Sequence, residues 1–527
     1  MYCLVMFPYP SGDGLHIGHA YNYALVDSYC RWQRYKGADV FQPFGYDAFG
    51  LPAENYARKH NRDPREVTYE NINKFRQQML KMSTNFEEKL VTSDASYIKW
   101  TQWLFTLMKD NDLAYKAMGI VNYCPSCVTV LANEQVKNEK CERCGSIIEK
   151  KELEQWYFRL SKYAERLLKN LDWVDYPEGT IKAQREWIGK SEGYEIDFNK
   201  FKVFTTKPKT LGDVKFIVTH SENGIEEKIG QIINPLNLDI IPIYTANYVI
   251  KGYGTGYVMG VPNDDKRDRD FAIRHNIAFD EEKISLSSID YPFITKKVNY
   301  KLHDWCISRQ RKWGCPIPIE GEQDTLDTFV DSSFYFLRYL TNSEDELIPL
   351  KDYKQVDLYV GGNEHACMHL IYARFINMVL FDLGYVPNEE PFKRVIHQGM
   401  ITNNGEKMSK SRGNVINPDS YDSDELRMYL MFIGHYFDGG SWDDSKISGI
   451  RRFISRFKTW LSTSTDVGET VELESFRIKI DGYVENFKFN KVISSFMEFY
   501  NANKNKKIHH NTANELKKIL ICFAPNF

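Results

Sequence analysis

The 527-residue sequence lacks several features that would settle a functional class at once. It has no hydrophobic run approaching the ~20 residues that span a membrane, so we expect no membrane partner. Its formal net charge is only -3, so any nucleic-acid partner must be bound by local basic patches. The start, MYCLVMFPYP, has no basic segment and no cleavage-like site, which argues against a signal peptide. We therefore expect a cytoplasmic protein.

Cysteine is scarce, with ten residues in 527, and six of them are scattered in contexts typical of buried thiols. This usage fits a reducing compartment. The other four form two C-x2-C pairs separated by thirteen residues: Cys124, Cys127, Cys141 and Cys144. Four thiolates at this spacing predict a closed structural zinc site, and a disulfide pair or unliganded thiols are the alternative.

The sequence opens with the pattern of a nucleotide-binding fold. Residues 2–7 form a short apolar run, a glycine-rich loop follows, residues 19–37 have helical apolar spacing, and residues 38–47 favour a second strand. Strand, loop, helix and strand in this order predict an α/β fold with a doubly wound, Rossmann-like parallel sheet. From about 194 to 300 the sequence is rich in β-branched residues, and residues 443–527 favour helices only.

The loop PYPSGDGLHIGHA, residues 8–20, carries the first candidate chemistry. Gly12, Gly14 and Gly18 let the backbone approach a ligand closely, and the start of the next helix offers N–H groups to anions. His16 and His19 lie about one helical turn apart and can donate hydrogen bonds to phosphate oxygens. The alternative is a strand-to-helix turn with incidental histidines.

A second candidate lies at KMSKSRGN, residues 407–414, behind a glycine turn. Lys407 and Lys410 are three residues apart among small hydroxyl residues, a composition that suits a polyphosphate ligand. Taken alone, the segment could be any exposed basic loop.

Together, HIGH and KMSKS are the two signatures of class I aminoacyl-tRNA synthetases, and six segments resemble leucyl-tRNA synthetases in particular. The segments are MFPYPSGDGLHIGHAYNY, PFGYDAFGLPAENYA, NYCPSCVTVLANEQV, LHDWCISRQRKWGCPIPI, DTFVDSSFYFLRYL and YVGGNEHACMHLIYARF. The resemblance runs from residue 1 to about 450 and is weaker beyond. Two alternatives stay open: a synthetase for another amino acid, and a synthetase-derived RNA-binding protein without aminoacylation activity.

The resemblance implies ATP-dependent activation of leucine to leucyl-adenylate, then transfer to the 3' end of tRNA(Leu), with Mg²⁺ assisting on the phosphates. It places His16, His19, Lys407 and Lys410 at the ATP phosphates. It assigns the rest of ATP to Gly18, Gly361, Gly362, Glu364 and Gln398. It also implies a monomer whose partners are tRNA(Leu), leucine and ATP.

The same resemblance implies a leucine site. Asp47 matches the carboxylate that holds the substrate ammonium. The apolar wall and side-chain pocket match Phe7, Tyr9, Phe329, Ser332, Tyr335, His365 and His369. Core packing is the alternative for each aromatic residue alone. The two histidines, four residues apart, could also imitate a metal pair, but no HExxH pattern is present.

Six ranges follow from this reading. We expect a catalytic Rossmann-like domain in two halves (1–118 and 301–442), a zinc-binding module (119–150), a helical connection (151–192), a reduced editing-like β domain (193–300) and a truncated anticodon-binding helical bundle (443–527). By the same resemblance, we expect no counterpart of the small C-terminal tRNA-binding domain that is usual in the family.

The β-rich insert resembles the family's editing domain but departs from its pattern. The family's TTRPDTLFG is TTKPKTLGD here, with Lys207 and Lys209 in place of Arg and Asp, and Asp264 stands where relatives carry His. Arg to Lys removes a bidentate fork. We expect weak or lost editing. A minimal working hydrolase using Thr205, Thr206, Thr210 and Asp268 is the alternative.

Overall fold

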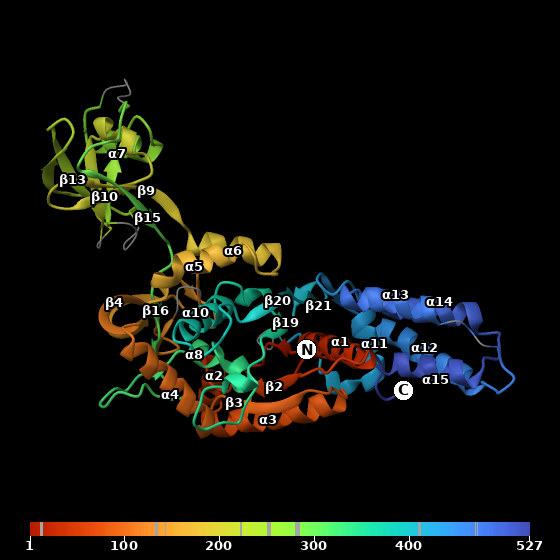
Figure 1. The fold of residues 1–527 in the computed structure, drawn as a ribbon. Coiled ribbons are helices and arrows are strands. Elements are labelled where there is room, and N and C mark those ends of the chain that lie inside the picture. Colours follow the sequence, from red (N-terminus) through yellow and green to blue (C-terminus); the bar gives the residue numbers. More distant parts are fainter. Residues whose placement is uncertain are drawn as a thin grey trace. The chain divides into compact units, whose positions relative to one another are not determined.

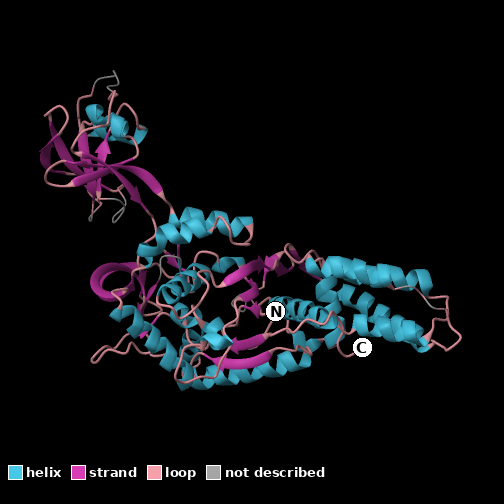
Figure 2. Ribbon diagram, in the orientation of Figure 1, coloured by secondary structure: helices cyan, strands magenta, loops and turns pink. Residues whose placement is uncertain are grey.

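The computed structural model describes residues 1–10, 14–131, 135–142, 144–221, 224–249, 255–279, 285–408, 413–469, 471 and 473–527. The chain forms two compact units, one of Met1–Gln184 with Asp304–Phe527, the other of Arg185–His303. The second unit contains the range 193–300 expected for the insert and adds a few residues on each side. Helices and strands are labelled in Figure 1 and distinguished by colour in Figure 2.

A parallel sheet forms the centre of the first unit. Its strands are β1 (Cys3–Val5), β2 (Pro43–Tyr46), β3 (Glu87–Val91), β19 (Val356–Gly361) and β20 (Phe392–His397). β1 pairs with β19, β19 with β20, and β2 with β3, all parallel. A parallel bridge between Tyr2 and Phe41 joins β1 to the segment entering β2. The strand order β3-β2-β1-β19-β20 therefore confirms the doubly wound fold.

The strands are added in opposite directions on the two sides of the neighbouring pair β1 and β19. On one side, the helix α1 (Ile17–Tyr35) leads from β1 outward to β2. On the other side, α10 (His369–Asp382) leads from β19 outward to β20. In open parallel sheets, ligands bind beyond the carboxyl ends of the strands at such a reversal. The position of the candidate site follows from this topology.

Further helices and strands complete the first unit. They are α2 (Leu51–Lys59), α3 (Pro64–Lys81), α4 (Ala95–Asp110), η2 (Leu160–Tyr163), α5 (Ala164–Asn170), α6 (Glu178–Ile188), β17 (Ser308–Arg309), β18 (Thr325–Leu326), α8 (Thr328–Ser332), α9 (Tyr335–Arg338), η4 (Leu350–Asp352) and η5 (Asn363–His365). The last of these helices before the insert, α6, ends within the second unit. Near the second signature, β21 (Met400–Asn403) pairs with β22 (Glu406–Lys407) and β23 (Gly439–Trp442), and η7 (Pro418–Ser420) follows.

The cysteine module extends from a long antiparallel hairpin. β4 (Ala114–Cys124) pairs with β8 (Glu149–Phe158), and β5 (Thr129–Leu131) and β16 (Trp305–Cys306) flank them. β6 (Val136–Lys137) and β7 (Lys140–Cys141) form a second, smaller hairpin. The range 151–192 expected to be helical thus begins with a strand, because β8 alternates exposed and half-buried residues along β4.

The second unit is β-rich, as expected for the insert. One sheet has the order β10 (Lys202–Thr205), β9 (Ser191–Asp197), β15 (Ile294–Asn299); the other has β12 (Lys228–Ile233), β13 (Ile240–Ala246), β11 (Phe216–His220), β14 (Tyr257–Gly260). Its core includes Ile196, Val203, Ile217 and Met259. The short helices η3 (Pro208–Asp213) and α7 (Lys266–Arg274) complete the unit.

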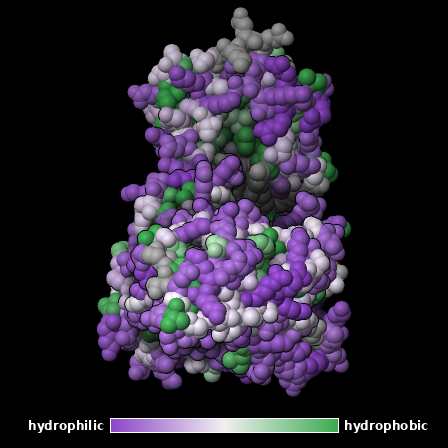
Figure 3. All heavy atoms as spheres, turned by 90° about the vertical axis from the view of Figure 1, so that its right-hand side faces the viewer, coloured by the Kyte–Doolittle hydropathy of each residue, from purple (hydrophilic) through white to green (hydrophobic). Residues whose placement is uncertain are grey.

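The C-terminal part is helical: α11 (Ser423–Phe432), α12 (Asp444–Ser462), α13 (Glu474–Glu485), α14 (Phe489–Asn503) and α15 (His510–Leu520). Phe457, Phe496 and Leu516 are fully buried in the core it shares with α1. On the face shown in Figure 3, hydrophobic side chains occur mostly as separate spots among hydrophilic ones. Among the described residues, no helix has the length and apolarity to span a membrane.

Candidate active site and cysteine cluster

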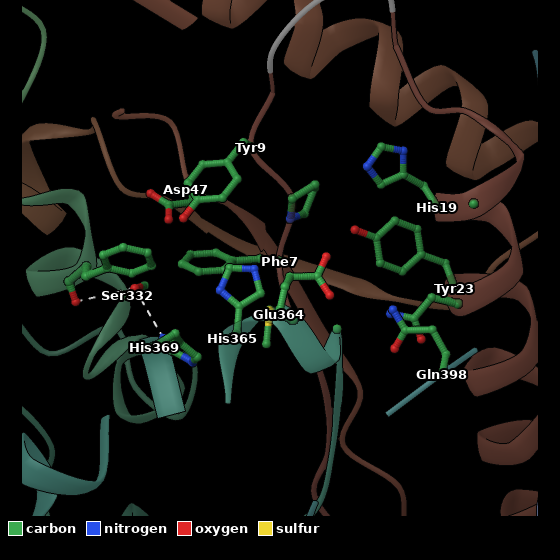
Figure 4. Close-up of a pocket in the computed structure, with 16 residues that line it drawn as sticks. Phe7, Tyr9, His19, Tyr23, Asp47, Ser332, Glu364, His365, His369 and Gln398 are labelled. Carbon is green, nitrogen blue, oxygen red and sulfur yellow. Dashed lines mark hydrogen bonds between the residues drawn. The ribbon is translucent and has the colours of Figure 1, made fainter. Parts of the chain in front are cut away.

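A cavity of about 200 Å³ lies beyond the carboxyl ends of β1 and β19. It is lined by Met6, Phe7, Pro8, Tyr9, Gly18, His19, Asn22, Tyr23, Asp47, Phe329, Ser332, Gly362, Glu364, His365, His369 and Gln398. In Figure 4, Asp47, Tyr9, Ser332 and His369 lie on one side of this cavity, while His19, Tyr23 and Gln398 lie on the other. The cavity thus has a carboxylate-bearing, partly apolar end and an end formed by the start of α1.

The two histidines of HIGH have different places. His16 is the N-cap of α1, and its Nδ1 accepts a hydrogen bond from the backbone N–H of Gly18 at 3.0 Å. The backbone N–H of His16 donates in turn to Nδ1 of His19 at 3.3 Å, a reciprocal capping box. Because Nδ1 of His19 accepts, the neutral ring carries its proton on Nε2. His19 therefore lines the cavity with a defined donor atom.

Asp47 follows β2 directly, and its backbone N–H donates to the carbonyl of Pro8 at 3.0 Å. This bond places the end of β2 beside the end of β1. The Asp47 carboxylate, which is 1% exposed, accepts from Thr328 Oγ1 at 3.0 Å. Burial, followed by the neighbouring Asp331 carboxyl, raises the pKa of Asp47 well above its usual range. A cation entering the cavity would pair with this carboxylate and reverse the shift.

A directed chain of hydrogen bonds supports the wall beside Asp47. Ser332 Oγ donates to the Phe329 carbonyl at 3.3 Å, and His369 Nδ1 is 3.3 Å from Ser332 Oγ. His369 Nε2 lies 2.7 Å from the Tyr359 hydroxyl. The Phe329 carbonyl can only accept, so the Ser332 hydroxyl uses its one proton there and its oxygen must accept from His369 Nδ1. Nδ1 therefore carries the His369 proton, and Nε2 accepts from the Tyr359 hydroxyl. Burial, with His365 nearby, lowers the pKa of His369 to about 3, so the ring is neutral.

Some expected site residues lie behind the cavity instead of lining it. Tyr335 is fully buried, stacks on Phe7 with ring centroids 4.0 Å apart, and donates to Tyr359 at 3.1 Å. Gly361 ends β19, where an added Cβ would lie 2.4 Å from the Cε of Met6. His16 caps α1. Tyr335, Gly361 and His16 therefore do not line this cavity, and each packs against residues that do. Their direct contact with a ligand stays a prediction.

The second signature is described only in part. Lys407 lies in β22, but its side chain lies outside the described part of the chain, as do Lys410 and Gly12 as whole residues. Met408 between the lysines is buried. The assignment of both lysines to the ATP phosphates stays a prediction.

Sequence reasoning missed four residues that line the cavity: Met6, Pro8, Asn22 and Tyr23. A helical period predicts two of them, since Asn22 follows Gly18 and Tyr23 follows His19 by four residues on one face of α1. Met6 and Pro8 alternate with Phe7 and Tyr9 directly after β1, so only the turn geometry shows that both sets face the cavity.

The four paired cysteines gather at one point. Their sulfur atoms all lie within 4.8 Å of one another, and Cys124 Sγ is 3.5 Å from Cys144 Sγ. Tetrahedral zinc with four thiolates has sulfur–sulfur distances of about 3.8 Å. Cys124, Cys127 and Cys141 are buried, and Asn55 Nδ2 donates to Cys127 Sγ at 3.6 Å. The donor set and its spacing fit a structural zinc ion.

In the second unit, the threonine loop lies next to the segment entering α7. Lys207 Nζ lies 2.5 Å from Asp264 Oδ2, so two departures from the family pattern pair with each other. Thr205 Oγ1 accepts from the Lys207 N–H at 3.0 Å, and Thr210 Oγ1 donates to the Lys207 carbonyl at 2.8 Å. Thr206 is exposed.

Asp268 is buried at the start of α7. Its carboxylate accepts from the Val261 N–H at 2.9 Å and from the Tyr248 hydroxyl at 3.3 Å. Burial raises its pKa despite these bonds. Both carboxylate oxygens thus have partners within the protein.

Two family descriptions match the chain. "tRNA synthetases class I (M)" matches residues 2–195 and 278–449, and "Leucyl-tRNA synthetase, editing domain" matches residues 185–232 and 219–285. The leucine–tRNA ligase of Caldanaerobacter subterraneus subsp. tengcongensis is 38% identical over 693 aligned positions, which cover all of this chain and 85% of the relative. That of Clostridium kluyveri is also 38% identical, with 100% and 85% covered.

Solved structures agree. A LeuRS of Agrobacterium radiobacter K84, in a ternary complex with tRNA and LeuAMS, superposes with a TM-score of 0.87 at 31% identity, covering 99% of this chain and 83% of that one. Methionyl-tRNA synthetase of Mycobacterium tuberculosis, bound by methionyl-adenylate, reaches 0.60 at 16% identity, with 99% and 92% covered, and shares the fold. The family match over most of the chain and full coverage at 38% identity show that the chain belongs to the leucine–tRNA ligase family of class I tRNA synthetases.

Proposed function

We propose that this chain activates leucine with ATP, releasing pyrophosphate, and transfers the leucyl group to the 3' end of tRNA(Leu). The observation that carries the proposal is the cavity itself. It joins a buried carboxylate and an apolar wall at one end to the N-terminus of α1 at the other. An apolar amino acid needs the carboxylate and the apolar wall, and a nucleoside triphosphate needs the helix N-terminus, so the two environments must lie side by side.

At the first end, Asp47 binds the leucine ammonium by a charge-assisted hydrogen bond. Phe7, Tyr9 and Phe329 supply apolar surface for the side chain, and neutral His369 avoids placing a second cation there. The leucine carboxylate is then free to point toward the other end. One of its oxygens attacks the α-phosphorus of ATP, forming the mixed anhydride while pyrophosphate leaves.

At the second end, the Nε2–H of His19 and the backbone at Gly18 receive the phosphates. Gly362, Glu364 and Gln398 receive the adenosine part. Lys407 and Lys410 neutralise the charge that develops on pyrophosphate, and Mg²⁺ associated with ATP supplies further neutralisation. The residues contribute mainly position and charge, as this reaction class requires.

Leucine-dependent exchange of pyrophosphate into ATP tests the activation step. We expect exchange with leucine to exceed that with valine, isoleucine or methionine, and transfer to tRNA(Leu) to follow. A folded, zinc-containing full-length protein without exchange would instead support the RNA-binding alternative. Exchange favouring another amino acid would support a synthetase of different specificity.

Zinc is proposed to hold the cysteine module together through Cys124, Cys127, Cys141 and Cys144. We expect one zinc ion per chain by metal analysis. Cys124→Ser lowers the metal content and makes the hairpin of β4 and β8 more sensitive to proteolysis, because ligand loss opens a closed site. Cys315→Ser, a buried cysteine outside the cluster, is the control and keeps its zinc. Unchanged metal content in the Cys124 variant would rule out this ligand set.

The insert is proposed to edit weakly or not at all. The hydroxyls of Thr205 and Thr210 and the carboxylate of Asp268 are bonded to the protein's own groups. We expect hydrolysis of isoleucyl-tRNA(Leu) close to the uncatalysed rate, with no further decrease in Asp268→Ala. Brisk hydrolysis that disappears in this variant would support the minimal hydrolase.

We also propose that the enzyme works in the cytoplasm as a monomer. The supporting observations are the four-thiolate cluster, which requires reduced cysteines, and the mostly scattered hydrophobic spots on the bundle face. Light scattering that gave a dimer mass would contradict the monomer, and cell fractionation would test the location.

A further inference from the structure

Gln78, near the end of α3, contacts the segments next to both signatures. Its Oε1 accepts from the backbone N–H of Leu15 at 2.6 Å, just before α1. Its Nε2 donates to Asn417 Oδ1 at 3.2 Å and to Asp419 Oδ2 at 3.1 Å, in the segment that follows KMSKS. One amide therefore bonds two segments from the two halves of the catalytic sequence.

Neighbouring contacts strengthen this junction. The backbone N–H of Ile17 donates to the carbonyl of Ile416 at 3.0 Å, and Lys81 Nζ donates to the carbonyl of Asp419 at 2.5 Å. Gly14 has a φ of +97°, and an added Cβ would lie 2.6 Å from Gln78 Oε1. Part of the glycine content of the first loop is thus required by the close approach of this amide.

The amide suits the junction because it offers an acceptor and donors on one short group. Gln78 is 4% exposed and Leu15 is 3% exposed, so an apolar side chain at position 78 would leave a buried N–H without a partner. Gln78 does not line the cavity. Its influence on the reaction must pass through the segments that it holds.

We propose that Gln78 is a positioning residue for adenylate formation, which rests on the proposed function. By bonding both segments, it sets the start of α1, which presents His19, against the segment that returns from KMSKS. The leucine end of the cavity is formed by other elements. The contribution of Gln78 therefore falls on the rate of activation and leaves leucine binding unchanged.

The test uses full-length protein in the leucine-dependent exchange assay. Gln78→Glu keeps the acceptor for Leu15 but sets a carboxylate against Asp419, and it should lower kcat about tenfold or more with the leucine KM within about twofold. Adding Asp419→Asn supplies a donor to the new carboxylate and should return kcat to within about threefold of wild type. Asp419→Asn alone should stay within about twofold, because its amide oxygen still accepts from Gln78.

Two further measurements keep the outcome clear. If Gln78→Glu does not fold, the double variant Asn417→Ala with Asp419→Ala removes both acceptors from exposed positions and should lower kcat about fivefold. Hydrogen exchange, which needs no activity, should rise together in peptides covering residues 14–25 and 414–421 of Gln78→Glu and return in the rescued variant. The proposal is overturned if kcat is unchanged in Gln78→Glu, if Asp419→Asn does not restore it, or if hydrogen exchange rises in only one of the two segments. If wild type showed no pyrophosphate exchange while hydrogen exchange of Gln78→Glu still rose in both segments, the result would count against the ligase function instead.

Discussion

Asp47→Asn raises the KM for leucine roughly 100-fold or more in the exchange assay. The substitution removes the one carboxylate at the apolar end of the cavity, and breaking a buried charge pair costs about 3 kcal/mol or more. The free enzyme should not lose stability at neutral pH. Burial raises the pKa of Asp47 in the folded state, so its ionisation opposes folding, and this cost grows as the pH rises through that pKa.

The same pKa shift gives leucine binding a pH dependence. The ammonium pairs only with the ionised carboxylate, so the wild-type KM should rise as the pH falls through the raised pKa of Asp47. Asp331→Asn is the matched control, because Asp331 is also buried with a raised pKa but does not line the cavity. It should keep leucine binding and move the acid limb to lower pH. A KM within threefold of wild type in Asp47→Asn would show that another group binds the ammonium.

Asp27→Ala lowers the stability of the first unit by about 3–5 kcal/mol, the usual cost of leaving a buried charge without its partner. Asp27 and Arg427 are both fully buried, 2.8 Å apart, and join α1 to α11. Arg427 also donates to the Phe523 carbonyl near the end of the chain at 3.3 Å. The urea midpoint for loss of exchange activity and of tryptophan fluorescence measures the effect.

The pH dependence of this pair has a definite sign. Burial favours the neutral carboxyl, but Arg427 and Arg31 outweigh it and lower the pKa of Asp27. A lowered pKa means that the stabilisation is present above the unfolded-state value of about 3.9 and is lost as the pH falls through the folded one. The difference between wild type and Asp27→Asn should therefore shrink in acid. Arg62→Ala, which removes only exposed ion pairs, should leave the urea midpoint almost unchanged. Equal losses of stability in Asp27→Ala and Arg62→Ala would contradict the buried-pair explanation.

Elements with a long, strong pattern were predictable, and those decided by a partner strand were not. The helix expected over 19–37 is α1. It covers Ile17–Tyr35, so it begins two residues earlier than expected, because His16 caps its start. β3 was not predicted, since its sequence EEKLV gains strand geometry only from pairing with β2. β8 was missed for the same reason, because its partner β4 precedes it by a whole cysteine module.

By itself, the sequence determined the family, the nucleotide fold, the cysteine cluster and most of the residues that line the cavity. The nucleotide fold and the cysteine cluster follow from local spacing, whereas the family and the cavity residues follow from motifs that resemble those of leucyl-tRNA synthetases. The tertiary structure alone decided that His16 caps α1 while His19 meets the cavity, that Tyr335 supports Phe7 from behind, and that Gln78 bonds both signature segments. These roles depend on contacts between side chains that are far apart in the sequence. The periodicity and residue spacing of a single sequence do not indicate such contacts.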